Sequence, residues 1–203
     1  MLSNPQIEEK LDPRVKRTRQ LLEQAFRDLL AEKGFDAINV QDVTDRAGVN
    51  RATFYAHFQD KFDLLDYSIR EAFRLEIKTR LLHSCHFSLQ NLHQLIVAVC
   101  KFTRNMSSHC VGAQRQFGPL AEKQIKEQLY ELILMWMKQS MHSLSPETSA
   151  TAASWAIYGL AMQWNQEKKT QSAEAFADEV LPIIAGNLNL AQTAIDQARP
   201  LPV

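Results

Sequence analysis

The sequence lacks most of the features that mark secreted and membrane-embedded proteins. Cysteine is scarce: Cys85, Cys100 and Cys110 form an odd set without paired spacing, which argues against a disulfide framework and fits a reducing compartment. No apolar run is long enough to cross a bilayer, and the opening residues carry neither a basic leader nor an apolar stretch. We therefore expect a cytoplasmic protein without membrane association.

Motifs of catalysis and metal binding are also missing. The chain has no Gly-rich phosphate loop, nucleophile elbow or His-Glu-x-x-His pattern, so an enzyme is not expected. The nearest approach to a metal site is His83, Cys85 and His86, together with His109 and Cys110, but these residues lack the paired spacing of a zinc cage. We predict no metal and no cofactor, and keep a metal or thiol sensor as an alternative.

The chain has no net charge, because 23 Lys and Arg residues balance 23 Asp and Glu residues. Such a protein has no global field that attracts nucleic acid, so binding of this kind requires local placement of charge. The 203 residues are 45% hydrophobic and 23% charged, which is an ordinary globular composition with room for one large or two small domains.

Helical periodicity extends along most of the chain. Apolar residues recur at intervals of three and four, and no segment gives a convincing strand, so the pattern predicts an all-α protein. The expected helices cover residues 14–33, 40–47, 50–58, 61–82, 89–107, 112–117, 120–143, 147–168 and 173–190, and Gly118-Pro119 is expected to end the one over 112–117.

Residues 38–58 are the most informative segment, because they read as two short helices folded about one glycine. Gly48 supplies a residue that tolerates positive φ just past the first helix, and Asn50 can cap the second. Helical spacing places Phe54 and Phe58 on the inward side of that second helix. The residues left to face outward are Arg51, Thr53, Tyr55 and His57. This arrangement is a helix-turn-helix, in which the second helix enters the DNA major groove.

Two domains are expected, joined by the long helix over 61–82, which a three-helix domain cannot bury alone. Residues 10–60 form the helix-turn-helix domain, in which Asn39 and Asp42 have the spacing of a capping box. Residues 61–203 form a larger helical domain. A basic cluster near the first helix start, made of Arg14, Lys16, Arg17 and Arg19, lies where a three-helix unit could touch a phosphate strand.

The last two expected helices carry more apolar residues than one core-facing stripe requires. This surplus predicts a homodimer held by a four-helix contact, with Trp155 and Ile184 among the contacting positions. Pro182 is expected to bend the last helix. The alternative is that the helix over 147–168 is simply the central helix of the monomer.

The first sixty-odd residues closely resemble the TetR family of bacterial transcriptional regulators. The resemblance rests on Gly34-Phe35, the run Val40–Ala47, the run Gly48–Phe58 and Lys61 at their fixed offsets. It implies an all-helical homodimer with a small DNA-binding domain and a larger domain that dimerises and often holds a small molecule. Beyond about residue 80, the likeness reduces to helix number and length.

Roles in DNA binding follow from the resemblance, position by position. Arg51 and Thr53 would contact base edges, since arginine can bond guanine bidentately and threonine offers a hydroxyl and a methyl group. Tyr55, His57 and Lys61 would hold the DNA backbone. The full expected set is Gln41, Thr44, Asn50, Arg51, Thr53, Tyr55, His57 and Lys61. The alternatives are that Tyr55 is half-buried between helices and that His57 only caps its helix.

The resulting hypothesis is a repressor that binds a palindromic operator as a dimer and is released by a small-molecule effector. Aromatic and methionine side chains of helical domains often line such cavities. The candidate effector-binding residues are Phe102, Met106, His109, Trp136, Tyr158 and Met162, and the alternative for each is an ordinary core position. A protein-interaction module that keeps the helical scaffold without binding an operator is the competing class of function.

Overall fold

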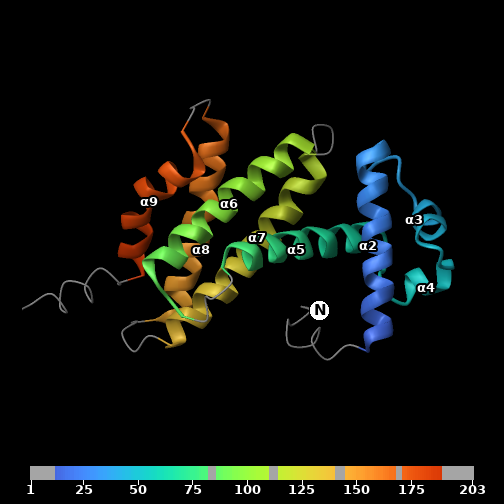
Figure 1. Ribbon diagram of the computed structural model, residues 1–203, viewed down its shortest axis with the longest axis horizontal. Coiled ribbons are helices and arrows are strands. Elements are labelled where there is room, and N and C mark those ends of the chain that lie inside the picture. The colour runs from blue at the N-terminus through green and yellow to red at the C-terminus, as the bar shows by residue number, and fades with distance from the viewer. Residues whose placement is uncertain (1–11, 82–85, 110–113, 140–144, 168–170, 189–203) are drawn as a thin grey trace, which may run out of the picture. The chain divides into compact units, whose positions relative to one another are not determined.

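The computed structural model describes residues 12–81, 86–109, 114–139, 145–167 and 171–188. All regular secondary structure in these ranges is helical, as predicted (Figure 1). The helices are α2 (Pro13–Lys33), α3 (Val40–Ala47), α4 (Arg51–Tyr55), α5 (Lys61–Arg80), α6 (Leu89–His109), α7 (Gln114–Gln139), α8 (Pro146–Gln166) and α9 (Ala173–Asn187). No helix in the described part of the chain is both long and apolar enough to span a membrane.

The chain forms two compact units that divide within α5, between Ile69 and Arg70. The first unit contains α2, α3, α4, the start of α5 and residues 114–117 of α7, and the second contains the rest of α5, α6, α8, α9 and α7 from Gly118 onward. The boundary predicted at residues 60 and 61 lies at the start of α5, whereas the two units divide further along the same helix.

The first unit is built on α2, whose ends follow local sequence signals. The Asp12 carboxylate accepts a hydrogen bond of 2.8 Å from the Arg14 N–H, and Pro13 occupies the first turn. Gly34 ends the helix with a φ of 72°. Figure 1 shows α3 and α4 on one side of α2. The buried face of α2 consists of Leu22, Glu23, Ala25, Phe26 and Leu29.

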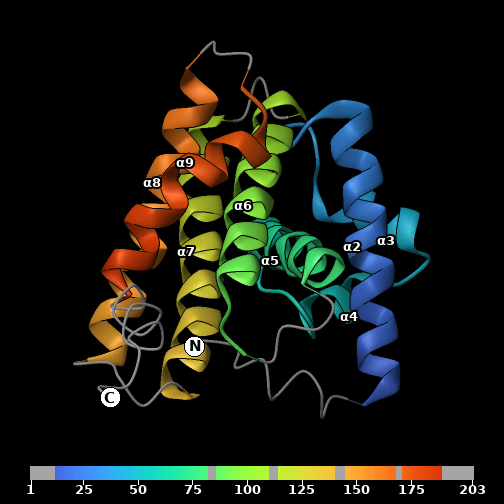
Figure 2. The ribbon, with the colours of Figure 1, turned by 60° about the vertical axis from the view of Figure 1, so that its left-hand side comes forward.

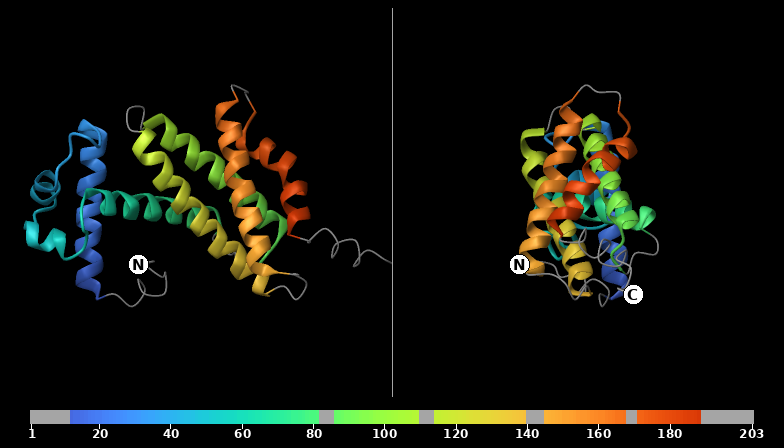
Figure 3. Two further views of the ribbon diagram at one scale, coloured as in Figure 1. Left: turned by 180° about the vertical axis from the view of Figure 1, so that it is seen from behind. Right: turned by 90° about the vertical axis from the view of Figure 1, so that its left-hand side faces the viewer.

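The second unit is centred on α6, which packs against both α8 and α9 (Figures 2 and 3). Residues 95–100 of α6 are all buried, and burial raises the pKa of the Cys100 thiol to about 12, as expected of an inert apolar position. The hydroxyl of the buried Thr103 accepts a bond of 2.7 Å from the Asn165 side chain on α8. An ion pair of Lys101 with Glu174, and a contact of 3.1 Å between His93 Nε2 and an Asp178 carboxylate oxygen, join α6 to α9. The central helix is therefore α6 and not α8.

One helix assignment from sequence was wrong. α7 runs unbroken from Gln114 to Gln139 through Gly118-Pro119, whereas the pattern predicted a break between 117 and 120. Proline removes one backbone hydrogen bond and crowds the preceding turn, but a helix persists when packing outweighs that cost. Here the packing comes from a buried stripe made of Ala121, Ile125, Leu129, Ile133, Trp136 and Met137. The predicted end at residue 143 lies outside the described residues.

Candidate nucleic-acid interface

The start of α3 is fixed by the capping box that the sequence predicts. The Asn39 side chain accepts a bond of 2.9 Å from the Asp42 N–H, and the Asp42 carboxylate accepts one of 2.8 Å from the Asn39 N–H. Lys33 at the end of α2 lies 2.7 Å from the same carboxylate. Hydrogen bonding to Lys33, and then to the Asn39 backbone, lowers the pKa of Asp42. The helix start is thus held to α2 as well as capped.

Gly48 makes the turn between α3 and α4 in the left-handed conformation, with φ 67° and ψ 34°. Its N–H donates to the Asp45 carbonyl at 3.3 Å, and the Val49 N–H donates to the Thr44 carbonyl at 3.0 Å. These bonds satisfy carbonyls at the end of α3 that have no helical partner. The chain can therefore reverse directly into the next helix.

The second helix, α4, is anchored at both ends. At its start, the Asn50 side chain accepts bonds from the Thr53 N–H at 2.7 Å and from the Thr53 hydroxyl at 2.9 Å. At its end, Phe54 and Phe58 are 0% and 3% exposed, with ring centroids 5.9 Å apart. The predicted cap and the predicted inward phenylalanines are confirmed, so the opposite face of α4 points outward.

That outward face brings most of the predicted DNA contacts together. Arg51 is exposed, Tyr55 is 52% exposed, and Thr53 and His57 are half-buried. The exposure of Tyr55 favours its predicted outward position over the half-buried alternative. Gln41 on α3 is also exposed, although its amide donates to Asp45 at 2.6 Å. Burial, and then the nearby Arg19 charge, lowers the pKa of His57, which favours the neutral imidazole.

Two of the predicted contacts lie elsewhere. Thr44 is only 1% exposed, and its hydroxyl donates to the Gln41 carbonyl at 3.0 Å, so its predicted contact with DNA is not supported. The ammonium of Lys61 donates to the carbonyls of Ile38 at 2.9 Å and Phe35 at 3.2 Å and is turned toward this unit's own loop. Nothing in the local sequence signals this use of Lys61, because the acceptors are backbone atoms more than twenty residues away.

Many basic side chains of the first unit are engaged internally. Arg46 makes two bonds to the Glu32 carboxylate, at 2.8 and 2.7 Å, and Arg19 lies over the rings of Phe58 and Tyr67 at 5.8 and 5.6 Å. By contrast, Arg51 on α4 and three residues at the start of α2 make no ion pair with any described residue. These three are Arg14, Lys16 and Arg17, and all are exposed. The available positive charge is therefore concentrated on two helix starts.

The predicted effector-binding residues occupy varied positions in the second unit. Trp136 is fully buried, and Phe102 is half-buried with its ring centroid 5.0 Å from that of Phe73. Burial, with a smaller effect of Glu122, raises the pKa of Tyr158 to about 12. Met106 and Met162 are half-buried, and the side chain of His109 lies outside the described set.

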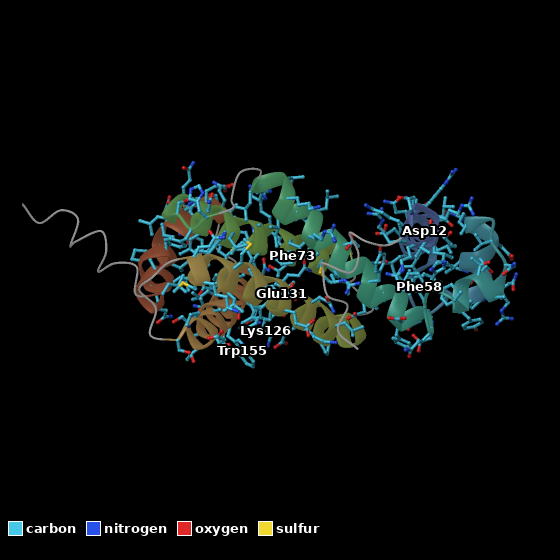
Figure 4. All side chains as sticks on the ribbon, turned by 90° about the horizontal axis from the view of Figure 1, so that it is seen from below. Asp12, Phe58, Phe73, Lys126, Glu131 and Trp155 are labelled. Atoms are coloured by element: carbon cyan, nitrogen blue, oxygen red, sulfur yellow. The ribbon has the colours of Figure 1, made fainter. Side chains whose placement is uncertain are left out.

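The structure shows a surface groove of about 620 Å³ along α7 and α8 that none of those six residues lines. Lys126 and Trp155 lie side by side on it, with the ammonium 3.6 Å from the indole centroid (Figure 4). The other lining residues are Pro119, Glu122, Lys123, Glu127, Tyr130, Thr151 and Ser154. Within the described residues, no group of His, Cys, Asp and Glu side chains is placed to hold a metal ion. His83, Cys85 and Cys110 lie outside those residues.

Comparisons with known proteins match the first unit most specifically. Residues 21–67 match the family model described as bacterial regulatory proteins, tetR family. The HTH-type transcriptional regulator YxbF of Bacillus subtilis is 42% identical over 66 residues, which are 32% of this chain and 17% of that protein. The dhaKLM operon transcriptional activator DhaS of Lactococcus lactis is 32% identical over 56 residues, which are 28% of this chain and 30% of that protein.

Solved structures extend the likeness to the whole fold. A TetR-family regulator from Streptomyces coelicolor shares 16% sequence identity with a TM-score of 0.59, over 88% of this chain and 98% of that one. By contrast, the match to each of the two curated relatives spans less than a third of that relative's length. The sequence likeness covers the helix-turn-helix, and the remaining helices share an architecture. The family model and both of these relatives describe regulatory proteins.

Proposed function

We propose that this chain, which belongs through its N-terminal helices to the TetR family of bacterial regulatory proteins, is a sequence-specific DNA-binding transcriptional regulator. The observation that carries the proposal is the outward face of α4. It projects from a turn at Gly48, is anchored by two buried phenylalanines, and presents Arg51 without an ion-pair partner among the described residues. A helix held in this way fits the major groove.

Within this proposal, α4 contacts the bases and the start of α2 binds phosphate. Arg51 and Thr53 contact base edges, while Tyr55 and His57 donate hydrogen bonds to the DNA backbone. Asn50 and Gln41 are further contacts. The exposed cations at the start of α2 supply the salt-dependent part of binding, which a chain of zero net charge must obtain locally.

Removing the guanidinium of Arg51 tests the proposal directly. Arg51→Ala should lose about 1–3 kcal/mol of discrimination between the preferred and random duplexes, because a bidentate base contact is worth that much. Preferred sites are first mapped by sequencing the genomic fragments that the purified wild-type chain retains. Lys138→Ala removes an exposed cation from the second unit and serves as the control. Equal discrimination by Arg51→Ala and wild type would contradict the assigned role.

We further propose that two copies associate through α8 and α9 and that the protein acts in the cytoplasm. Trp155 on α8 is 61% exposed and Ile183 on α9 is 60% exposed, so each of these two packed helices of the second unit carries one large exposed apolar side chain. A dimer formed in this way would bind a palindromic operator and place its two recognition helices roughly 34–36 Å apart in successive major grooves. Ile184 is fully buried and is withdrawn from the predicted contact set.

Regulation by a small molecule completes the proposal. The first unit carries the proposed DNA-binding face, and it shares α5 with the larger second unit. An effector that binds the second unit and favours a conformation unable to bind the operator would shift the population away from the DNA-binding conformation. This arrangement supports a repressor that an effector releases. One matched relative is named as an activator, so repression and activation must be distinguished by experiment. Transcription from a mapped promoter should rise when the gene for this chain is deleted, and a fall would reverse the sign.

A further inference from the structure

Lys61 is the first residue of α5, and its ammonium group is directed at the loop that joins α2 to α3. It donates to the carbonyls of Ile38 at 2.9 Å and Phe35 at 3.2 Å, with a longer contact of 3.5 Å to that of Asp36. The same nitrogen lies 4.5 Å from the centroid of the Phe35 ring. An ammonium has three donors, and this loop occupies them.

The loop that Lys61 holds determines where α3 begins. Phe35 and Ile38 are 2% and 1% exposed, so their side chains fix the loop from inside while the ammonium binds its carbonyls. The next residue, Asn39, is the cap of α3. From there the chain reaches α4 through a short helix and the bonded turn at Gly48. A displacement of residues 35–38 would therefore be passed on to the outward face of α4.

We propose that Lys61 is a positioning residue that sets the orientation of α4 through the loop at residues 35–38 and does not bind a DNA phosphate. The inference rests on the proposed function and assigns this lysine a different role from the one that family resemblance implies. Reaching toward a phosphate would strip donors from half-buried carbonyls, and such groups are costly to leave unpaired. The Lys61 ammonium is therefore already engaged by the loop carbonyls.

The test uses Lys61→Met, which retains an unbranched apolar stem beside Phe35 and removes the ammonium. Affinity is measured for the preferred duplex and for a duplex of random sequence over a range of salt concentrations, far below the unfolding temperature. The ratio of the two affinities should fall about tenfold, which is the size of one misplaced base contact. The slope of log K against log salt on the random duplex should equal that of the wild type, because no phosphate contact is lost.

A matched control separates positioning from a general loss of stability. Ala25→Gly weakens the buried face of α2 without touching the loop, and its affinity ratio should remain at the wild-type value. A salt slope that drops by about 0.9 in Lys61→Met, with an unchanged ratio, would identify a phosphate contact and overturn the proposal. A lower unfolding temperature with both ratio and slope unchanged would reduce Lys61 to a stabilising residue and overturn it as well.

Failure of the proposed DNA-binding function can be distinguished from failure of the positioning role of Lys61. If the wild-type chain prefers no duplex over random sequence, DNA-based readouts carry no information, and hydrogen exchange of the free protein decides the matter. The amides of Ile38 and Asp42 are bonded within the loop and the capping box. They should exchange faster in Lys61→Met than in Ala25→Gly, and equal exchange would show that the lysine does not hold the loop.

Discussion

Gly34 and Gly48 both have positive φ, but they occupy different regions of backbone space. Gly48, with φ 67° and ψ 34°, is in the left-handed helical region, which asparagine also adopts. Gly34, with φ 72° and ψ 163°, lies where essentially only glycine is found. A Cβ added at either position would meet no atom within 4 Å, so backbone strain alone determines the cost of substitution.

This contrast predicts how the two sites respond to the same changes. Alanine at Gly48 should lower the free energy of unfolding by about 1–2 kcal/mol, and asparagine there should recover most of that loss. At Gly34, asparagine should be about as harmful as alanine. Urea unfolding of the four variants measures the differences, and recovery by asparagine at Gly34 would show that this backbone can relax.

At the residue scale, short-range signals in the sequence located the turn and its caps. The pairs Asn39 with Asp42 and Asn50 with Thr53 are three residues apart, so their geometry follows from one helical turn. Thr44 was misassigned although the same periodicity held the answer, because position 44 is one turn beyond Val40 and next to the buried Val43. A polar residue type at a core position concealed its burial.

At the scale of the element, α7 shows that buried packing can carry a helix through a proline. Pro119 lies inside the helix, whereas Pro146 begins α8, where a missing N–H has no cost. Sequence signals treat Gly-Pro as a stop because they register local propensity. The buried stripe that overrides this signal becomes evident only once its partners are in place.

The two prolines should therefore respond differently to replacement by alanine. Pro119→Ala restores a backbone hydrogen bond within α7 and should raise the free energy of unfolding by about 1–3 kcal/mol. Pro146→Ala should leave it unchanged or slightly lower. Denaturant unfolding followed by circular dichroism measures both, and an unchanged value for Pro119→Ala would mean that α7 already accommodates the ring without strain.

At the scale of the whole molecule, the all-helical class was predictable, although nine helices were expected and the described residues form eight. The functional surfaces required the structure. Periodicity separates buried from exposed faces, but neighbouring positions such as Ile183 and Ile184 both appear apolar in the sequence. The structure shows the first 60% exposed and the second fully buried. Ile184 continues the buried stripe of Phe176 and Val180 at four-residue intervals, so the spacing contained a signal that composition did not.

These adjacent positions provide a test of the proposed dimer. Ile183→Glu should yield a folded monomer with weakened binding to a palindromic duplex, because the charge lies on the proposed contact surface. Ile184→Glu should instead destabilise the fold by on the order of 4 kcal/mol, because it buries an unpaired charge. Light scattering gives the mass and circular dichroism the folded fraction. A folded Ile183→Glu dimer would place the contact on another surface.

The tether from Lys61 to the loop before α3 also bears on attempts to change what the protein reads. Exchanging residues 39–58 for the equivalent stretch of another regulator would replace the base-contacting side chains. The orientation of the inserted helix would still be set by host residues outside the exchanged segment. A chimera faithful to its donor should take residues 35–61 as one block, so that lysine and carbonyls travel together.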